Sequence, residues 1–213
     1  MTSPVVLVTG VTSSLGKAIV RRLAFAGYKV AAADRCANSV NEVTVDNKKV
    51  GGDVTGFAVD IGDSNQRNEL ISRVASELGS LDSLVVVPPD NDVHGDIMET
   101  STKQFDKLFN DRLTIPFKLT KAALPTLQKS NAAKCGVRVN AVCLGMVAGD
   151  GSGAFWDSKV PDEAMQQFQS MIPLGRLGKP SDAASLVQFL LSPRARYITG
   201  ENCVLNGGVS FRL

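Results

Sequence analysis

The sequence predicts an α/β fold built on a doubly wound parallel sheet, and three observations support this class. Short apolar runs rich in β-branched residues alternate along the chain with segments of helical periodicity. These runs are apolar at consecutive positions, which is typical of strands buried on both faces. The first run ends at Gly10, and a helical pattern begins within a few residues of that glycine. A strand, a glycine turn and a helix in this order form the repeating unit of such folds.

The first predicted strand spans residues 5–8, and the turn Thr9-Gly10 leads into a helix that ends near Gly27. A turn of this kind points backbone amides and the positive end of a helix dipole at an anion, usually a pyrophosphate. We therefore expect this turn to bind a dinucleotide. The expected contacts are Gly10, Thr12, Ser13, Ser14, Leu15 and Gly16.

The second predicted strand spans residues 29–33 and ends at Asp34 and Arg35. A carboxylate at this point is placed to accept a hydrogen bond from the 2′-hydroxyl of an adenosine ribose. The same carboxylate repels a 2′-phosphate, so Asp34 favours NAD over NADP, and Arg35 beside it softens that preference. The alternative interpretation of Asp34 is a turn residue at the end of a strand.

The later elements continue the alternation. Residues 36–54 are polar and predict a loop with room for a short helix. Residues 102–129 have a helical pattern that Pro116 and Pro125 interrupt, which predicts a kink or two helices. The other expected elements are strands over 55–59, 84–87, 137–142 and 202–205, and helices over 64–79 (N-cap Ser64), 162–171 and 180–191 (N-cap Ser181).

Composition limits the classes of function. The 213 residues predict one domain spanning 1–213, and no apolar run reaches the ~20 residues that cross a bilayer. A net charge of +2, with acids and bases interspersed, argues against nucleic-acid binding. His94 is the single histidine and the four cysteines form no C-x-x-C pair, so no metal site is expected. Reduced, packed cysteines favour the cytoplasm.

Several motifs together carry a resemblance to a known family. Thr9, Gly10 and Gly16 fit the pattern T-G-x-x-x-G-x-G, with Ser14 in place of the middle glycine. Residues 136–142, 175–182 and 197–208 fit three further patterns toward the C-terminus. With these motifs the chain resembles the classical short-chain dehydrogenases/reductases. Its ending is similar, less specifically, to their carbonyl-reductase branch of the dehydrogenase/reductase member 4 type.

The resemblance implies a Rossmann-type fold and an NAD(P)-dependent interconversion of carbonyl and alcohol groups in a small substrate. It implies that Asp60 contacts the adenine amino group and that Ile61 lies against the adenine ring. It also implies cofactor contacts by Gly145 and Val147, which follow the strand over 137–142. NAD is the expected cofactor because of Asp34, and NADP stays open.

The chain departs from the family at the acid/base pair. The family uses a Tyr as general acid/base and a Lys four residues later that lowers the pKa of the phenol. Tyr28 is followed at that distance by Ala32, and Tyr197 by Glu201, so no catalytic residue is predicted. After Ser130 the chain runs directly into the strand over 137–142, where the family has one further strand and helix, roughly 30 residues. The helix over 102–129 is still expected to link the strands over 84–87 and 137–142 as a right-handed crossover.

Three more family positions differ. Residues 86–89, Val-Val-Pro-Pro, stand where the family has N-N-A-G, and Arg112 stands where it has an active-site Asn. Leu144-Gly145 replaces its P-G, and Ser14 adds a Cβ where the backbone approaches phosphate.

Three hypotheses of function remain open at this point. The chain binds a dinucleotide and has lost its chemistry, or it is an active oxidoreductase whose acid is Ser130, Lys134 or His94, or it is a non-catalytic partner subunit. A spliced or wrongly assembled reading frame of an active reductase is a form of the second hypothesis. A homo-oligomer stays open, because the family pairs through two long helices and one is mostly missing. Residues 211–213, Phe-Arg-Leu, resemble a peroxisomal address with Phe at its small-residue position, an alternative to the cytoplasm.

Overall fold

The computed structural model describes residues 3–89, 97–130, 136–148, 166–167 and 169–209. His94, Lys134, the glycine-rich residues 149–153, most of the helix expected over 162–171 and the C-terminal Phe-Arg-Leu lie outside these ranges. Within the described residues, no helix combines the length and the apolar character that crossing a membrane requires.

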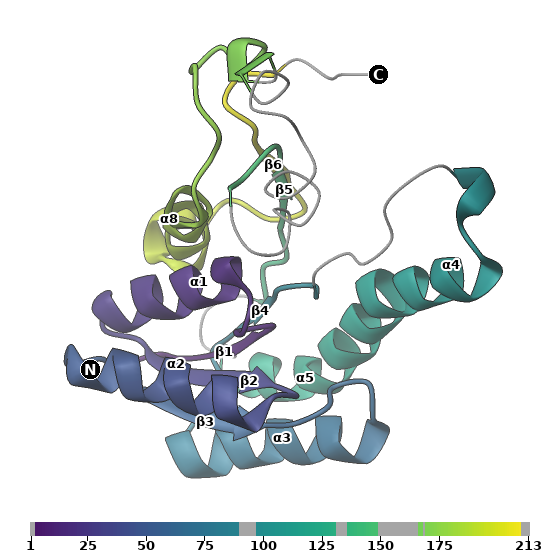
Figure 1. The fold of residues 1–213 in the computed structure, drawn as a ribbon. Coiled ribbons are helices and arrows are strands. Elements are labelled where there is room, and N and C mark those ends of the chain that lie inside the picture. Colours follow the sequence, from purple (N-terminus) through teal and green to yellow (C-terminus); the bar gives the residue numbers. More distant parts are fainter. Residues whose placement is uncertain (1–2, 90–96, 131–135, 149–165, 168, 210–213) are drawn as a thin grey trace.

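A four-stranded parallel sheet forms the centre of the fold (Figure 1). Its strands are β1 (Val5–Thr9), β2 (Lys29–Asp34), β3 (Val54–Ala58) and β4 (Ser83–Val86), in the order β3-β2-β1-β4. All five residues of β1 are buried, as a central parallel strand with helices on both faces requires. The predicted α/β class and parallel sheet are confirmed.

Alternate residues of the strands face two different helical layers. Val6 and Val8 pack in one cluster with α1 (Ser14–Phe25), α2 (Ala37–Lys49) and α8 (Pro180–Leu191). Val5 and Leu7 pack in a second cluster with α3 (Ser64–Leu78) and α5 (Ile115–Ser130). This covering on both faces makes the sheet doubly wound.

Three local predictions were wrong. Residues 36–54 contain the full helix α2, which packs Val40 and Val43 on the sheet although its other faces are polar. Asp63 rather than Ser64 caps α3, because the Asp63 carboxylate accepts from the amides of residues 65 and 66. The N-cap of α8 is Lys179 rather than Ser181, because Pro180 occupies the first helical position.

The long helical region divides before its first proline. Helix α4 (Thr102–Phe109) passes into a π-helical segment, η2 (Asn110–Thr114), and then into α5. Pro116 follows the π-helical segment directly and supplies no backbone amide there, and Pro125 lies inside α5 without ending it. The predicted break is therefore confirmed, and its form is a π-helical segment.

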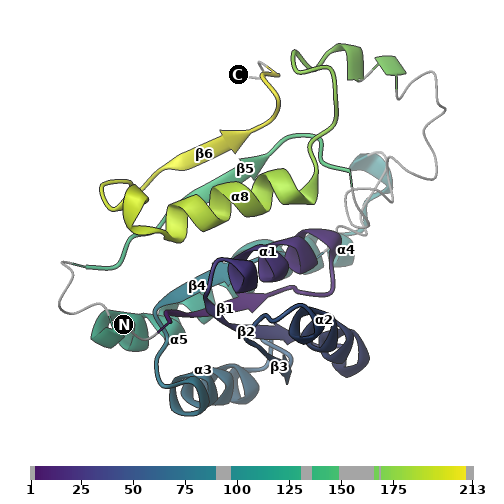
Figure 2. The ribbon, with the colours of Figure 1, turned by 90° about the vertical axis from the view of Figure 1, so that its left-hand side faces the viewer.

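A second, two-stranded parallel sheet pairs β5 (Ala141–Leu144) with β6 (Asn202–Leu205). The strand expected over 137–142 begins later, because Arg138, Val139 and Asn140 bond instead to residues 198–201. The predicted crossover was also wrong: among the described strands, β4 pairs with β1 alone and β5 with β6 alone. Figure 2 shows β5 between β6 and the four-stranded sheet, with α8 beside α1.

Candidate nucleotide-binding site

The carboxyl ends of all four strands of the main sheet meet at one pocket with a cavity volume of about 160 Å³. Ligands of open α/β sheets bind at this edge, next to the point where the strand order reverses. Here the order reverses between β1 and β4. Of the residues predicted from the sequence, the pocket brings together Gly10, Thr12, Ser13, Asp34, Arg35, Asp60 and Ile61.

The turn between β1 and α1 closes on itself through Ser13. Its hydroxyl donates to the carbonyl of Gly10 at 2.9 Å and accepts from the amide of Gly16 at 3.1 Å. Gly10 has a φ of 72°, and a Cβ there would lie 2.3 Å from the carbonyl oxygen of Val87. A Cβ on Gly16 would lie 2.1 Å from the carbonyl oxygen of Gly10. Both glycines are therefore required by the backbone of the turn itself, before any phosphate is considered.

Ser14, Leu15 and Gly16 belong to the first turn of α1 and are not among the described residues that line this pocket. Leu15 lines a second cavity, between β4 and β5. Their role as cofactor contacts stays a prediction.

Asp34 connects the end of β2 to the β1–α1 turn. Its Oδ2 accepts from the amide of Thr12 at 3.2 Å and from the Thr12 hydroxyl at 2.9 Å, and its Oδ1 accepts from the amide of Arg35 at 2.7 Å. A carboxylate has about four acceptor sites, so one remains for a ligand hydroxyl. The partnership with Thr12 was not recognised from the sequence, because the two residues are 22 positions apart. It fixes the orientation of the carboxylate at the pocket.

The end of β3 supplies Asp60 and Ile61. Asp60 Oδ1 accepts from the amide of Gly62 at 2.8 Å, which shapes a tight loop before α3. Arg67, only 7% exposed, donates through Nη1 to the carbonyl of Ile61 at 2.8 Å and more weakly to Gly62 and Asp63. Sequence reasoning missed Arg67, which positions this loop by donating hydrogen bonds to its backbone carbonyls. A buried arginine on an otherwise apolar helix face was the available signal.

The end of β4 closes the pocket with Val87, Pro88 and Pro89. Neither proline has a backbone N–H, so this rim offers no amide at those two positions. Arg112, from η2, donates through Nη2 to the carbonyl of Pro89 at 3.2 Å and lines the neighbouring cavity. The arginine thus holds the rim.

Gly145 and Val147 lie with the second sheet, and neither is among the described lining residues of the nucleotide pocket. The amide of Gly145 donates to the carbonyl of Leu205, and a Cβ on Gly145 would meet Asn206 at 2.7 Å. Val147 is 8% exposed and forms a bridge with Gly178. Their cofactor contacts therefore also stay predictions.

The described residues contain no group resembling an activated tyrosine. Tyr197 is fully exposed near the second sheet. Burial raises the pKa of Tyr28, with the charge of Arg138 opposing it, whereas a catalytic phenol needs a lowered pKa. Ser130 is a half-buried residue at the end of α5. Among these residues no cluster of metal-ligating side chains occurs either.

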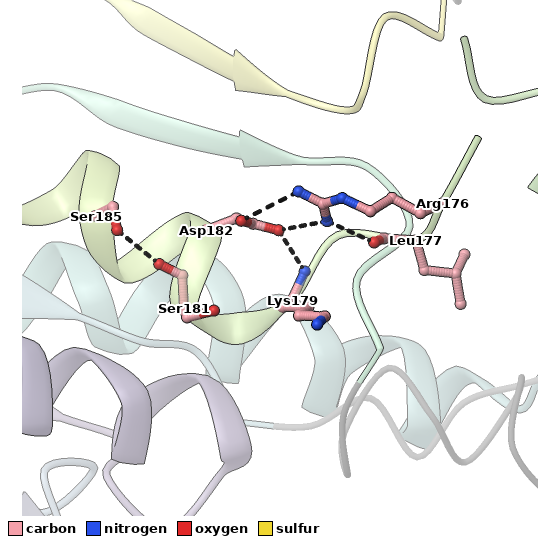
Figure 3. A network of polar contacts seen from close by, with 6 residues as sticks. All are labelled: Arg176, Leu177, Lys179, Ser181, Asp182 and Ser185. Atoms are coloured by element: carbon pink, nitrogen blue, oxygen red, sulfur yellow. Dashed lines mark hydrogen bonds and ion pairs between the residues drawn. The ribbon is translucent and has the colours of Figure 1, made fainter. Parts of the chain in front are cut away.

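The motif over residues 175–182 has a structural role (Figure 3). Asp182 accepts from Arg176 Nη1 at 2.8 Å and from the amide of Lys179 at 2.8 Å. The hydrogen bond from Arg176, followed by that from Lys179, lowers the pKa of Asp182. Because Asp182 lies in the first turn of α8, its negative charge also interacts well with the helix dipole. The motif therefore starts α8, which packs on α1 under the nucleotide turn.

Comparisons with known proteins agree with this geometry. Residues 4–135 match the family described as short chain dehydrogenase, and residues 130–210 match enoyl-(acyl carrier protein) reductase. The chain is 29% identical over 252 positions to human dehydrogenase/reductase SDR family member 4, covering all of this chain and 90% of that protein. The Caenorhabditis elegans protein of the same name is 28% identical over 249 positions, with 98% of this chain and 96% of that protein covered.

Solved structures show the same fold at low identity. Actinorhodin polyketide ketoreductase, in a variant with NADPH, superposes with a TM-score of 0.89 at 22% identity, covering 99% of this chain and 98% of that one. A short-chain type dehydrogenase/reductase from Mycobacterium ulcerans gives 0.87 at 20% identity, with coverages of 100% and 91%. With the family match spanning more than half of its residues, the chain belongs to the short-chain dehydrogenase/reductase family.

Proposed function

We propose that this chain is a single NAD(P)-binding domain over residues 1–213 that prefers NAD and has little or no oxidoreductase turnover. The observation that carries the binding proposal is the carboxylate of Asp34, fixed at the pocket by Thr12 with one acceptor site remaining. The β1–α1 turn beside it supplies amides and a helix N-terminus for the pyrophosphate. As the family name indicates, the bound nicotinamide would supply hydride transfer.

The preference for NAD follows from charge. A 2′-phosphate adds negative charge beside the Asp34 carboxylate, which Thr12 prevents from turning away. Arg35 is exposed, and among the described residues that line the pocket its guanidinium is the one cationic group that offsets this repulsion. We expect the Asp34 effect to dominate.

The proposed loss of turnover rests on the sequence. Neither of its two tyrosines is followed by a Lys four positions later. A positioned acid or base contributes typically ~10²–10⁴-fold to such a reaction. The relatives align over 252 positions with a chain of 213 residues, so they carry residues that have no counterpart here. This supports the proposal that a segment bearing the acid/base pair is missing.

The names of the relatives favour a second candidate, an active oxidoreductase acting on a small carbonyl or alcohol substrate. Its proton donor would then be Ser130, Lys134 or His94. Lys134→Ala and His94→Ala are the first tests of this candidate, because substitution of the residue that donates the proton would reduce any measured turnover.

Calorimetric titration with NAD and NADP tests the binding proposal. The unmodified protein is expected to bind NAD more tightly, by about tenfold, the worth of one unfavourable charge contact. Asp34→Ala is expected to narrow or reverse this difference. Asp46→Ala is the matched control, because Asp46 is an exposed aspartate of α2 paired only with Lys49 in the described contacts. Tighter binding of NADP by the unmodified protein would contradict the proposal.

A further inference from the structure

A cavity of about 850 Å³ lies between the two sheets. Leu84 and Val85 of β4 form one side, and Val142 and Leu144 of β5 form the other. Residues of α1 and α8, such as Ile19, line one face, and residues of α5 line the opposite face. Figures 1 and 2 both show β5 on the side of β6 that is toward β4. The cavity therefore has two strand edges and two helical faces.

Both strand edges have backbone groups available for pairing. Ala141 and Gly145 donate their amides to the carbonyls of Glu201 and Leu205, on the β6 side. Because amides alternate in direction along a strand, those of Val142 and Leu144 point to the opposite edge of β5. Within the described part of the chain, neither that edge nor the second edge of β4 pairs with a strand. Such edges are places where another strand adds.

The side chains along the cavity are mostly apolar but are less buried than those of the main sheet's interior. β4 contains Leu84, Val85 and Val86, yet all its residues are only half-buried, whereas β1 is buried throughout. Leu144 is 38% exposed, and Val139, another residue of the lining, is 60% exposed. Covering these side chains is favourable, in proportion to the apolar area removed from water.

The unpaired backbone groups of the two strand edges and the half-buried apolar side chains together identify the occupant. An aliphatic small molecule would cover the side chains but leave the amides and carbonyls of both edges without partners. A charged or strongly polar ligand would meet walls that are mostly aliphatic, and the charged lining residues Asp82, Arg112 and Arg138 already hydrogen-bond to other groups of the protein. An extended polypeptide fits both, since its backbone bonds to the two edges while its alternating side chains face the two helical layers.

We propose that this cavity binds an extended apolar segment of another polypeptide, of about five residues, the usual length of a strand. The segment inserts between β4 and β5 and joins the two sheets into one. Recognition is by backbone pairing and by apolar side chains on both faces, so it tolerates different sequences. This cavity adjoins the nucleotide pocket, and Val86, Val87, Pro88 and Pro116 line both.

The test uses a synthetic peptide in which the sequence Val-Val-Leu-Val-Thr, taken from β1, is flanked by lysines for solubility. Its partner is the same peptide with N-methyl groups on alternate amides, which keeps every side chain and removes backbone donors. Binding is measured by titration, and amide hydrogen exchange locates it. We expect slower exchange at residues 84–86 and 142–144, and binding of the methylated peptide weaker by about tenfold or more.

Val142→Pro removes one amide at the cavity edge and is expected to weaken peptide binding by about tenfold. A proline elsewhere, such as Val45→Pro, would be an unsuitable control because it would break helix α2. Val204→Thr, on exposed β6, is the matched control and should leave binding unchanged. The proposal would be overturned by equal binding of the two peptides or by no binding. Protection from exchange confined to α4 and α5, or equal displacement of both peptides by decanoate, would also overturn it.

Discussion

The two sheets of this molecule have similar strand sequences and opposite degrees of burial. β1 and β2 are enclosed by helices on both faces, while three of the four residues of β5 are exposed. The strands of the main sheet bring Gly10, Asp34 and Asp60 to one pocket. The second sheet is held by side-chain bonds to backbone, from Arg138 and Asn140. The comparison teaches that the family motifs of the main sheet form the nucleotide pocket, whereas those of the second sheet maintain local structure.

The largest expected effect is at the nucleotide turn. Gly10→Ala places a Cβ against the carbonyl of Val87 and should destabilise the protein by about 3 kcal/mol and abolish nucleotide binding. Gly51→Ala is the matched control, because Gly51 has a similar φ of 82° with nothing within 4 Å, and should lower stability by only about 1 kcal/mol. Denaturant unfolding measures both. Equal losses would show that Gly10 is needed for its φ alone.

The second effect concerns the link between the two regions. Arg138 donates to the carbonyls of Leu190 and Ile198, so Arg138→Ala should destabilise the surroundings of β5 and β6 by about 2 kcal/mol. Hydrogen exchange should accelerate at residues 141–144 and 202–205 and remain slow in β1 and β2. Arg194→Ala, at an exposed arginine in the same region, serves as the control. Uniform acceleration throughout the chain would mean that the two sheets unfold as one unit.

The smallest effect is at the start of α8. The pKa of Asp182 is lowered in the folded protein, so its contribution to stability is present above the unfolded pKa of about 3.9 and is lost as the pH falls through the folded value. Asp182→Asn should shift the folding equilibrium by about fivefold at pH 7, the worth of a helix cap, and by less near pH 3. Chemical unfolding at both pH values measures this. A larger effect at pH 3 would contradict the assignment.

Much of the main sheet was predictable, because buried parallel strands are continuous apolar runs and glycines mark their turns. α2 was not, since only Val40 and Val43 of its mostly polar sequence indicate a buried face. The position of β5 was not predictable either, because Val137 and Val139 have strand-like side chains but the intervening Arg138 bonds to other loops. In the site, Asp34 was recognised from its place after a strand. Thr12 and Arg67 act through contacts that sequence spacing does not reveal.

The central claim is binding without turnover, and the most direct measurement is NAD(P)H absorbance with purified protein already shown to bind the nucleotide. Dicarbonyls, quinones, retinal and secondary alcohols are the substrates to supply. We predict negligible turnover with either cofactor, because neither Tyr28 nor Tyr197 has a Lys four positions later. A turnover number of about 1 per second or more, within the ordinary range of enzymes, would contradict the account.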